Sequence, residues 1–142
     1  MRILFDTNIV LDLLLDREPF SQDAQILFTR VERGEVIGML CATTITTIHY
    51  LVGRSLGKEK STEIIKSLLK LFEVASVTRT VLEDALEVQD KDYEDSVLYK
   101  SAYHSGADLI VTRDRSGFDK SDIPVMNPQE LLALLESIDE KE

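Results

Sequence analysis

Residues 2–8 of the chain read RILFDTN, a short apolar run followed by an acid, a hydroxyl residue and an amide. This order predicts a buried strand over residues 2–6 and a helix from Thr7 to about Asp16, because aspartate favours the position just before a helix. The same order recurs at residues 108–114, DLIVTRD, where a second apolar run again ends near an acid. The fold is therefore expected to contain two buried strands, each with a carboxylate at its carboxyl end.

The rest of the chain continues the alternation of strands and helices. Further strands are predicted over residues 36–42, 72–77 and 124–126. Helices are predicted between them. Pro19 opens the second, with Ser21 near its start, and Thr43 or Thr44 caps the third. Thr78 and Asp92 cap two later helices, and Asn127 with Glu130 marks the start of the last. Such alternation predicts a single α/β domain over residues 1–142, with a central parallel sheet covered by helices on both faces.

The composition of the chain argues against several classes of function and of metal site. The 142 residues carry a formal charge of -10, which argues against nucleic-acid binding by bulk charge alone. No apolar run reaches the roughly 18 residues of a membrane span, and the acid at position 6 is incompatible with a secretory signal, so a cytoplasmic protein is expected. With one cysteine and two histidines, a bound metal would be held by oxygen, which favours Mg²⁺ or Mn²⁺.

Three acids are candidates for such a site. Asp6 and Asp114 follow predicted strands, and Asp95 lies in the first turn of a helix that leads into the strand before Asp114. Since parallel α/β sheets bind ligands beyond the carboxyl ends of their strands, the three side chains can converge if the two strands are neighbours. Each acid also has a structural interpretation, as a helix cap, as a charge at a helix N-terminus, or as part of a turn.

The sequence also resembles the PIN domain, and most closely the bacterial toxin ribonucleases of the VapC type. The resemblance rests on three segments: FDTNIVLDLLLDREPF at residues 5–20, DYEDSVLYKSAYHSGADLIVTRD at 92–114, and RSGF at 115–118. Related proteins share an opening of the form DTNIVLDLLLxR. The resemblance implies a three-layer Rossmann-like fold, an acidic pocket for Mg²⁺ or Mn²⁺, and endonucleolytic cleavage of single-stranded RNA. It further implies a homodimer and, for a toxin, an antitoxin partner.

Carried over by position, the resemblance assigns roles to individual residues. Asp6, Asp95 and Asp114 are the implied metal ligands. Asn8 matches an asparagine that braces the pocket through hydrogen bonds, and Thr112 matches a hydroxyl residue at the end of the strand.

The chain departs from the family pattern at two places. The helix after the second strand usually carries a glutamate, but residues 43–49 hold no acid, and Thr47 or His49 stands nearest. In addition, Gly117 precedes Phe118, where the family often has an aspartate. Three other acids could supply the missing carboxylate: Glu94, Asp12 and Asp119.

Three polar residues keep two interpretations each, and a fourth, Asp12, has a supporting role. His49 is either a general base or phosphate contact, or a packed helix residue, and packing is expected more often. Arg113 and Arg115 flank Asp114, so they either bind RNA phosphates or pair with acids. Asp12 lies one helical turn from Asn8 and is expected to support the site from behind.

Three functions are compatible with these residues. A metal-dependent endoribonuclease is favoured. A phosphoryl-transfer domain of the receiver or haloacid-dehalogenase type also places an aspartate after the first strand, but needs a late lysine that residues 108–114 lack. A catalytically impaired PIN fold that serves as an interaction module is the third.

Self-association is expected because the first two helices are rich in apolar residues: Leu13, Leu14, Phe20 and Phe28.

Overall fold

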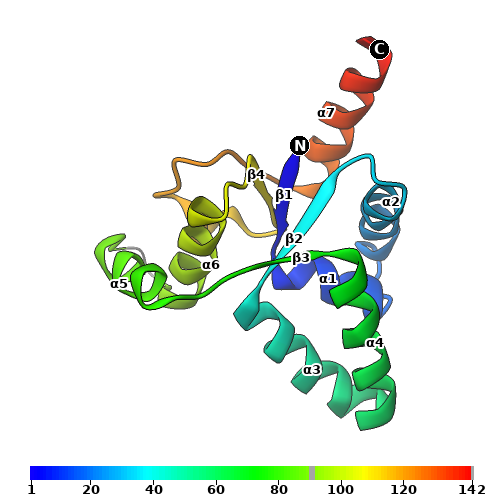
Figure 1. The fold of residues 1–142 in the computed structure, drawn as a ribbon. Helices are drawn as coiled ribbons and strands as arrows, with labels where there is room; N and C mark the ends of the chain where they lie inside the picture. Colours follow the sequence, from blue (N-terminus) through cyan, green and yellow to red (C-terminus); the bar gives the residue numbers. More distant parts are fainter. Residues whose placement is uncertain (90–91, 142) are drawn as a thin grey trace.

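The computed structural model describes residues 1–89 and 92–141. Five parallel strands form one sheet in the order β3-β2-β1-β4-β5, so β1 lies at its centre (Figure 1). This confirms the predicted α/β class with a parallel sheet. The strands are β1 (Arg2–Phe5), β2 (Ile37–Cys41), β3 (Glu73–Ala75), β4 (Leu109–Val111) and β5 (Val125–Met126).

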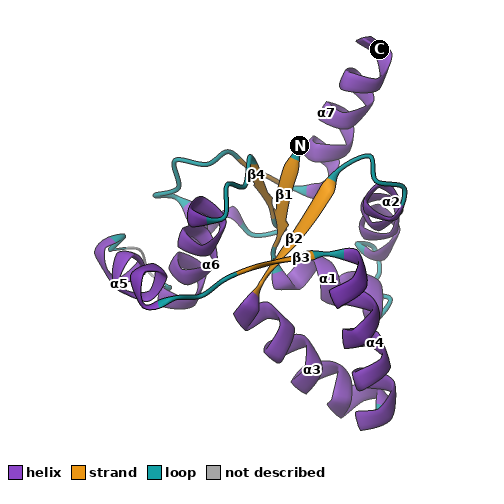
Figure 2. Cartoon of the chain, in the orientation of Figure 1, coloured by secondary structure: helices purple, strands orange, loops and turns teal. Residues whose placement is uncertain are grey.

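Helices cover both faces of the sheet, as Figure 2 shows. They are α1 (Thr7–Leu14), α2 (Ser21–Glu32), α3 (Ala42–Leu56), α4 (Lys58–Leu71), α5 (Arg79–Glu87), α6 (Tyr93–His104) and α7 (Pro128–Lys141), with a short 3₁₀ helix, η1 (Arg115–Phe118). In the described part of the chain, no helix is long and apolar enough to cross a membrane.

The two faces of the sheet are covered by different sets of helices. Ile3 and Phe5 of β1 pack in a core with residues of α1, α2, α3, α4 and α7, whereas Leu4 packs in a second core with α6 and η1. This alternation follows from the pleat of a strand, which points successive side chains to opposite faces. The fold is therefore three-layered, with α5 packed on the outer side of α6 (Figure 1).

The larger core is organised around three phenylalanines. Phe5, Phe28 and Phe72 meet edge to face, with ring centroids 5.2–5.7 Å apart. A Cβ atom at Gly38 of β2 would lie 2.5 Å from the ring of Phe72, so only glycine lets this ring lie against the strand. The cluster joins β1, α2 and the segment before β3 into one packed unit.

Several helix ends agree with the sequence predictions and two do not. Asp6, Thr78 and Asp92 cap α1, α5 and α6 with their side chains, and Asn127 and Glu130 exchange hydrogen bonds of 3.0 and 2.8 Å at α7. The two other predicted starts were wrong.

The second helix begins at Ser21 rather than at Pro19. The third begins at Ala42, after Cys41, without a side-chain cap. Thr44 is buried instead, and its hydroxyl lies 2.9 Å from that of Thr7, so tertiary contact rather than capping decides its place.

Candidate active site

The acidic pocket lies at the carboxyl edge of the sheet, where β1 and β4 run side by side. Phe5 pairs with Val111 in register, and the Asp6 amide donates a 2.9 Å hydrogen bond to the Val111 carbonyl. The pocket, of about 280 Å³, has nine lining residues: Asp6, Thr7, Asn8, Leu11, Arg17, Glu94, Asp95, Leu98 and Asp114. The three acids singled out in the sequence therefore line one pocket, together with Glu94.

Asp6 is the most enclosed of these acids, at 8% exposed. One carboxylate oxygen accepts a 2.7 Å hydrogen bond from the Thr7 amide, and the other accepts a 2.7 Å bond from the Thr112 hydroxyl. Burial raises the pKa of Asp6, and repulsion by Glu94 and Asp114 adds to this, while the two hydrogen bonds oppose it. Asp6 is thus both the helix cap that local sequence predicts and a pocket carboxylate.

Asp95 reaches the pocket from the first turn of α6, where its amide is bonded to the Asp92 cap. Burial, followed by repulsion from Asp6, Asp92, Glu94 and Asp114, raises its pKa to about 7. Its carboxylate lies against Gly117 of η1: a Cβ atom there would sit 1.9 Å from Oδ2 of Asp95. The departure from the family pattern at position 117 therefore creates the space that Asp95 occupies.

Asp114 differs from the other two acids because it lies at the open rim of the pocket. Its Oδ1 accepts hydrogen bonds from the Ser116 amide at 3.0 Å and the Ser116 hydroxyl at 2.6 Å. These bonds lower the pKa of Asp114, so it is ionised at neutral pH. The pocket thus combines a firmly ionised carboxylate with two that burial and mutual repulsion make reluctant to ionise.

Asn8 and Thr112 connect the loops that carry Asp6 and Asp114. The Asn8 side-chain amide donates to the Thr112 hydroxyl at 3.4 Å and accepts from the Arg113 amide at 3.4 Å. The Thr112 hydroxyl also accepts a 3.1 Å bond from the Asp114 amide. Because Thr112 is buried and bonded to both carboxylate-bearing segments, it fixes their spacing.

Asp12 is 1% exposed and is not among the residues that line the pocket. Arg113 donates to both of its oxygens, through Nη2 at 3.1 Å and through Nε, and the Arg113 guanidinium lies 4.0 Å from the ring centre of Phe20. Asp12 is therefore not the missing carboxylate. The pairing also decides between the two interpretations of Arg113, whose charge is committed to an acid of its own chain.

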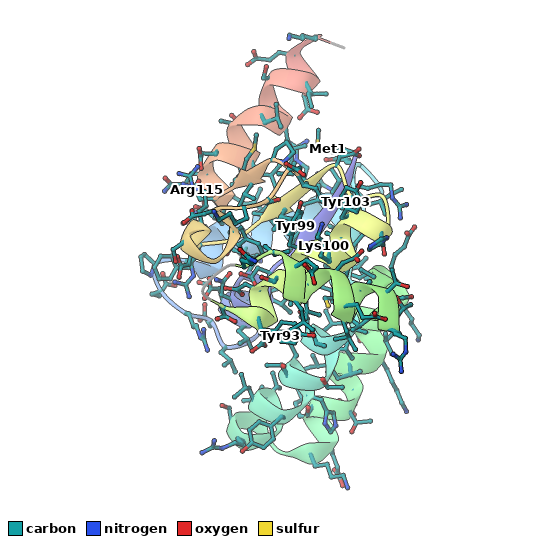
Figure 3. All side chains as sticks on the ribbon, turned by 90° about the vertical axis from the view of Figure 1, so that its left-hand side faces the viewer. Met1, Tyr93, Tyr99, Lys100, Tyr103 and Arg115 are labelled. Atoms are coloured by element: carbon teal, nitrogen blue, oxygen red, sulfur yellow. The ribbon has the colours of Figure 1, made fainter. Side chains whose placement is uncertain are left out.

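Three further candidates lie outside the pocket. Arg115, labelled in Figure 3, pairs with Glu130 at the surface, 3.3 Å apart. Asp119 is exposed and does not line the pocket, which leaves Glu94 as the additional acid there. His49 is exposed on α3, so the expectation of a packed histidine was wrong. Its site role is also unsupported, because His49 is not among the residues that line the pocket. Its helix, α3, packs with α4 as a hairpin that extends beyond the sheet (Figure 1).

Arg17 also lines the pocket, and the sequence did not predict it. Its positive charge is opposite in sign to the charges of the pocket's acids. A signal was present, since Arg17 is the final residue of the DTNIVLDLLLxR opening. Its place in the pocket depends on the turn after α1, and nothing in the local sequence shows that this turn brings Arg17 beside the acids.

The donor set of the pocket suits a hard cation, since all four acids present carboxylate oxygens. Within residues 1–89 and 92–141, no three histidine, cysteine, aspartate or glutamate side chains are arranged to hold a metal as they stand. Asp6 and Asp114 instead have oxygens committed to Thr112 and Ser116. Burial, with repulsion between the acids, raises the pKa of Asp6 and of Asp95, and a divalent cation bound beside them would favour their ionised forms.

Comparison with known proteins agrees with this fold. The PIN domain family model matches residues 2–116, so the chain belongs to the PIN domain family. A characterised relative, Ribonuclease VapC1 of Aquifex aeolicus (strain VF5), is 25% identical over 134 residues, which cover 91% of this chain and 92% of that protein.

Solved structures share the fold across nearly the whole chain. FitAcB from Neisseria gonorrhoeae superposes with a TM-score of 0.68 at 21% identity, over 89% of this chain and 98% of that one. VapC20 from Mycobacterium tuberculosis, a toxin that cleaves the sarcin–ricin loop, gives a TM-score of 0.64 at 16% identity, over 80% and 90%. These likenesses confirm the predicted three-layer PIN fold.

Proposed function

We propose that this protein is a metal-dependent endoribonuclease that cleaves phosphodiester bonds of single-stranded RNA. The observation that carries the proposal is the convergence of Asp6, Glu94, Asp95 and Asp114 on one pocket at the carboxyl edge of the sheet. The residues come from three distant parts of the sequence, so helix capping alone gives no reason for them to meet. The relative named as a ribonuclease supports the reaction class.

Asp6, Asp95 and Asp114 would hold the cation, Mg²⁺ or Mn²⁺, with Glu94 beside them. When bound, such an ion supplies a water-derived nucleophile and stabilises charge on the reacting phosphate. The chain itself orients the acids: Thr112 fixes Asp6, Ser116 fixes Asp114, and Gly117 leaves room for Asp95. Because the pKa of Asp95 is about 7 in the metal-free pocket, cation binding and loss of its proton should be coupled.

Cleavage of a labelled single-stranded RNA tests the proposal. Activity is expected with Mg²⁺ or Mn²⁺ and is expected to disappear with excess chelator or in Asp6→Asn. Asparagine still caps a helix as well as aspartate does, so the variant should remain folded. Activity that survives both chelator and Asp6→Asn would overturn the nuclease mechanism.

A catalytically impaired PIN module is the second candidate. It is favoured by the absent glutamate in residues 43–49 and by the lack, among described side chains, of a three-ligand group ready to bind a metal. Calorimetry separates the two, because the nuclease must bind a divalent cation and the impaired module need not. The phosphoryl-transfer alternative loses its support, since the chain belongs to the PIN family and Arg113 is paired with Asp12.

The proposed function includes protein partners. A toxin–antitoxin complex from Klebsiella pneumoniae is among the neighbouring structures, which supports an antitoxin partner for this chain. A homodimer is proposed on the resemblance, together with an apolar groove of α1, α2 and α4 lined mainly by Leu13, Leu14, Phe28, Ile64, Leu68 and Leu71. Sedimentation of the isolated protein as a monomer at micromolar concentration would refute the homodimer.

A further inference from the structure

Arg17 is the basic residue among those that line the acidic pocket. With Asp6, Glu94, Asp95 and Asp114 all ionised, the pocket carries four negative charges against this one positive charge. A phosphodiester that enters is repelled by these acids, so any cation at the rim contributes to binding. Arginine suits that role because its planar guanidinium donates two parallel hydrogen bonds to phosphate oxygens.

The turn after α1 holds the backbone of Arg17 in place. Asp16 adopts a left-handed conformation with φ of 49°, which reverses the chain directly before Arg17. The Arg17 amide donates a 3.0 Å bond to the Asp12 carbonyl, and the Arg17 carbonyl accepts 2.8 Å bonds from the amides of Phe20 and Ser21. The start of α2 thus anchors Arg17, and its side chain alone is left to move.

The guanidinium of Arg17 is held loosely. Its Nη1 lies 3.8 Å from Oδ1 of Asp12, beyond a good hydrogen bond, and its side chain is 39% exposed. Among the residues that the structure describes, 1–89 and 92–141, the one carboxylate within ion-pair distance of Arg17 is that of Asp12.

Asp12 does not need Arg17 for neutralisation, because Arg113 already pairs with both of its oxygens. The two arginines that flank Asp12 therefore have different tasks. Arg113 compensates the buried charge and is held on the ring of Phe20, whereas the charge of Arg17 is available to a ligand in the pocket.

We propose that Arg17 binds a non-bridging phosphate oxygen of the RNA strand at the acidic pocket, with Asp12 holding its guanidinium at the rim until substrate arrives. The inference rests on the proposed ribonuclease function. It adds a substrate contact from the chain's own residues, in a pocket whose other charged groups are all acids.

RNA binding at several salt concentrations tests this role. A labelled single-stranded RNA is titrated in the presence of Mg²⁺ with Asp6→Asn protein, which is expected not to cleave it, and with the same protein carrying Arg17→Ala, Arg17→Lys or Arg33→Ala. Arg33 is an exposed arginine at the end of α2 that lines none of the pockets described here, so Arg33→Ala is the matched control.

Arg17→Ala is expected to weaken binding about tenfold, the loss expected for one charge-assisted hydrogen bond. It should also reduce the slope of log affinity against log salt by about 0.7, the value for one phosphate contact to a single strand. Arg17→Lys should keep the slope and part of the affinity, while Arg33→Ala should change neither. In the otherwise native protein, Arg17→Ala should lower kcat/KM for RNA with an unchanged melting temperature.

Each other outcome has a distinct meaning. Native protein that cleaves RNA, combined with an unchanged affinity and salt slope in Arg17→Ala, overturns the role of Arg17 and leaves the ribonuclease proposal intact. Weaker binding with an unchanged slope and a lower melting temperature also overturns it, because that pattern describes a structural residue. If native protein neither binds nor cleaves RNA under any divalent cation, the proposed function itself fails.

Discussion

Replacement of Gly117 by alanine should separate the activity of this protein from its stability. The added Cβ atom would lie 1.9 Å from Oδ2, 2.7 Å from Cγ and 3.1 Å from Cβ of Asp95. Ordinary contact begins at 3.4 Å, so the carboxylate oxygen must move by about 1.5 Å. Because the atom that must move is the end of a half-buried side chain, the fold can accommodate the change by rotating Asp95.

The expected loss of activity is large compared with the loss of stability. A displacement of about 1 Å in a catalytic group can cost a factor of about 100 in rate, so kcat/KM should fall about 100-fold. A carboxylate turned away from its preferred rotamer costs about 0.5–1.5 kcal/mol, which bounds the expected decrease in the free energy of unfolding. Cleavage of single-stranded RNA with Mg²⁺ measures the first quantity, and urea denaturation measures the second.

Gly53 provides the matched control, since a Cβ atom there would lie 3.8 Å from its nearest neighbours, both in Ser61. Gly53→Ala in the middle of α3 should keep full activity and gain up to about 1 kcal/mol of stability. If Gly117→Ala acts through Asp95, adding it to Asp95→Asn should cause no further loss of activity. Wild-type activity in folded Gly117→Ala, or an additive loss in the double variant, would refute this reasoning.

Three further predictions concern the charged groups. Asp6→Asn should remain folded and lose metal-dependent cleavage by at least about 100-fold, as one missing charge-stabilising group does in other enzymes; an RNA cleavage assay beside thermal unfolding measures both. Because the pKa of Asp95 rises from 3.8 to about 7 on folding, the metal-free native state holds a proton that the unfolded chain releases, so stability should fall as pH rises from about 4 to 7. Asp95→Asn should flatten that part of the pH profile and raise the free energy of unfolding at pH 8 by about 1 kcal/mol. The gain is small because solvent screens a half-exposed group. An unchanged profile would contradict the shared pocket. Arg113→Ala leaves buried Asp12 without its main partner and should cost about 3 kcal/mol in urea unfolding, whereas a loss below about 1 kcal/mol would show that Arg17 suffices.

The sequence by itself determined the local structure and the main acids. Apolar runs such as Leu109–Val111 identify their own strands, because burial on both faces leaves no alternation. Asp6 and Asp92 identify helix starts, since a cap needs only the backbone amides a few residues ahead. Once strands and helices alternate, parallel pairing follows, and with it the sheet edge at which Asp6 and Asp114 are expected. That they meet Asp95 there depends on β1 and β4 being neighbours, which the structure shows.

Tertiary structure decided what each polar side chain does. Arg113 and Asp12 are about a hundred residues apart, and their pairing needed the β1–β4 contact before it could be seen. Arg17 joins the pocket because the chain reverses at Asp16, and Gly117 is needed because η1 passes over Asp95. His49 is exposed on α3 and is not among the residues that line the pocket. These outcomes depend on contacts between distant segments, whereas strand and cap signals depend on neighbours along the chain, which is why the sequence revealed the acids but not their surroundings.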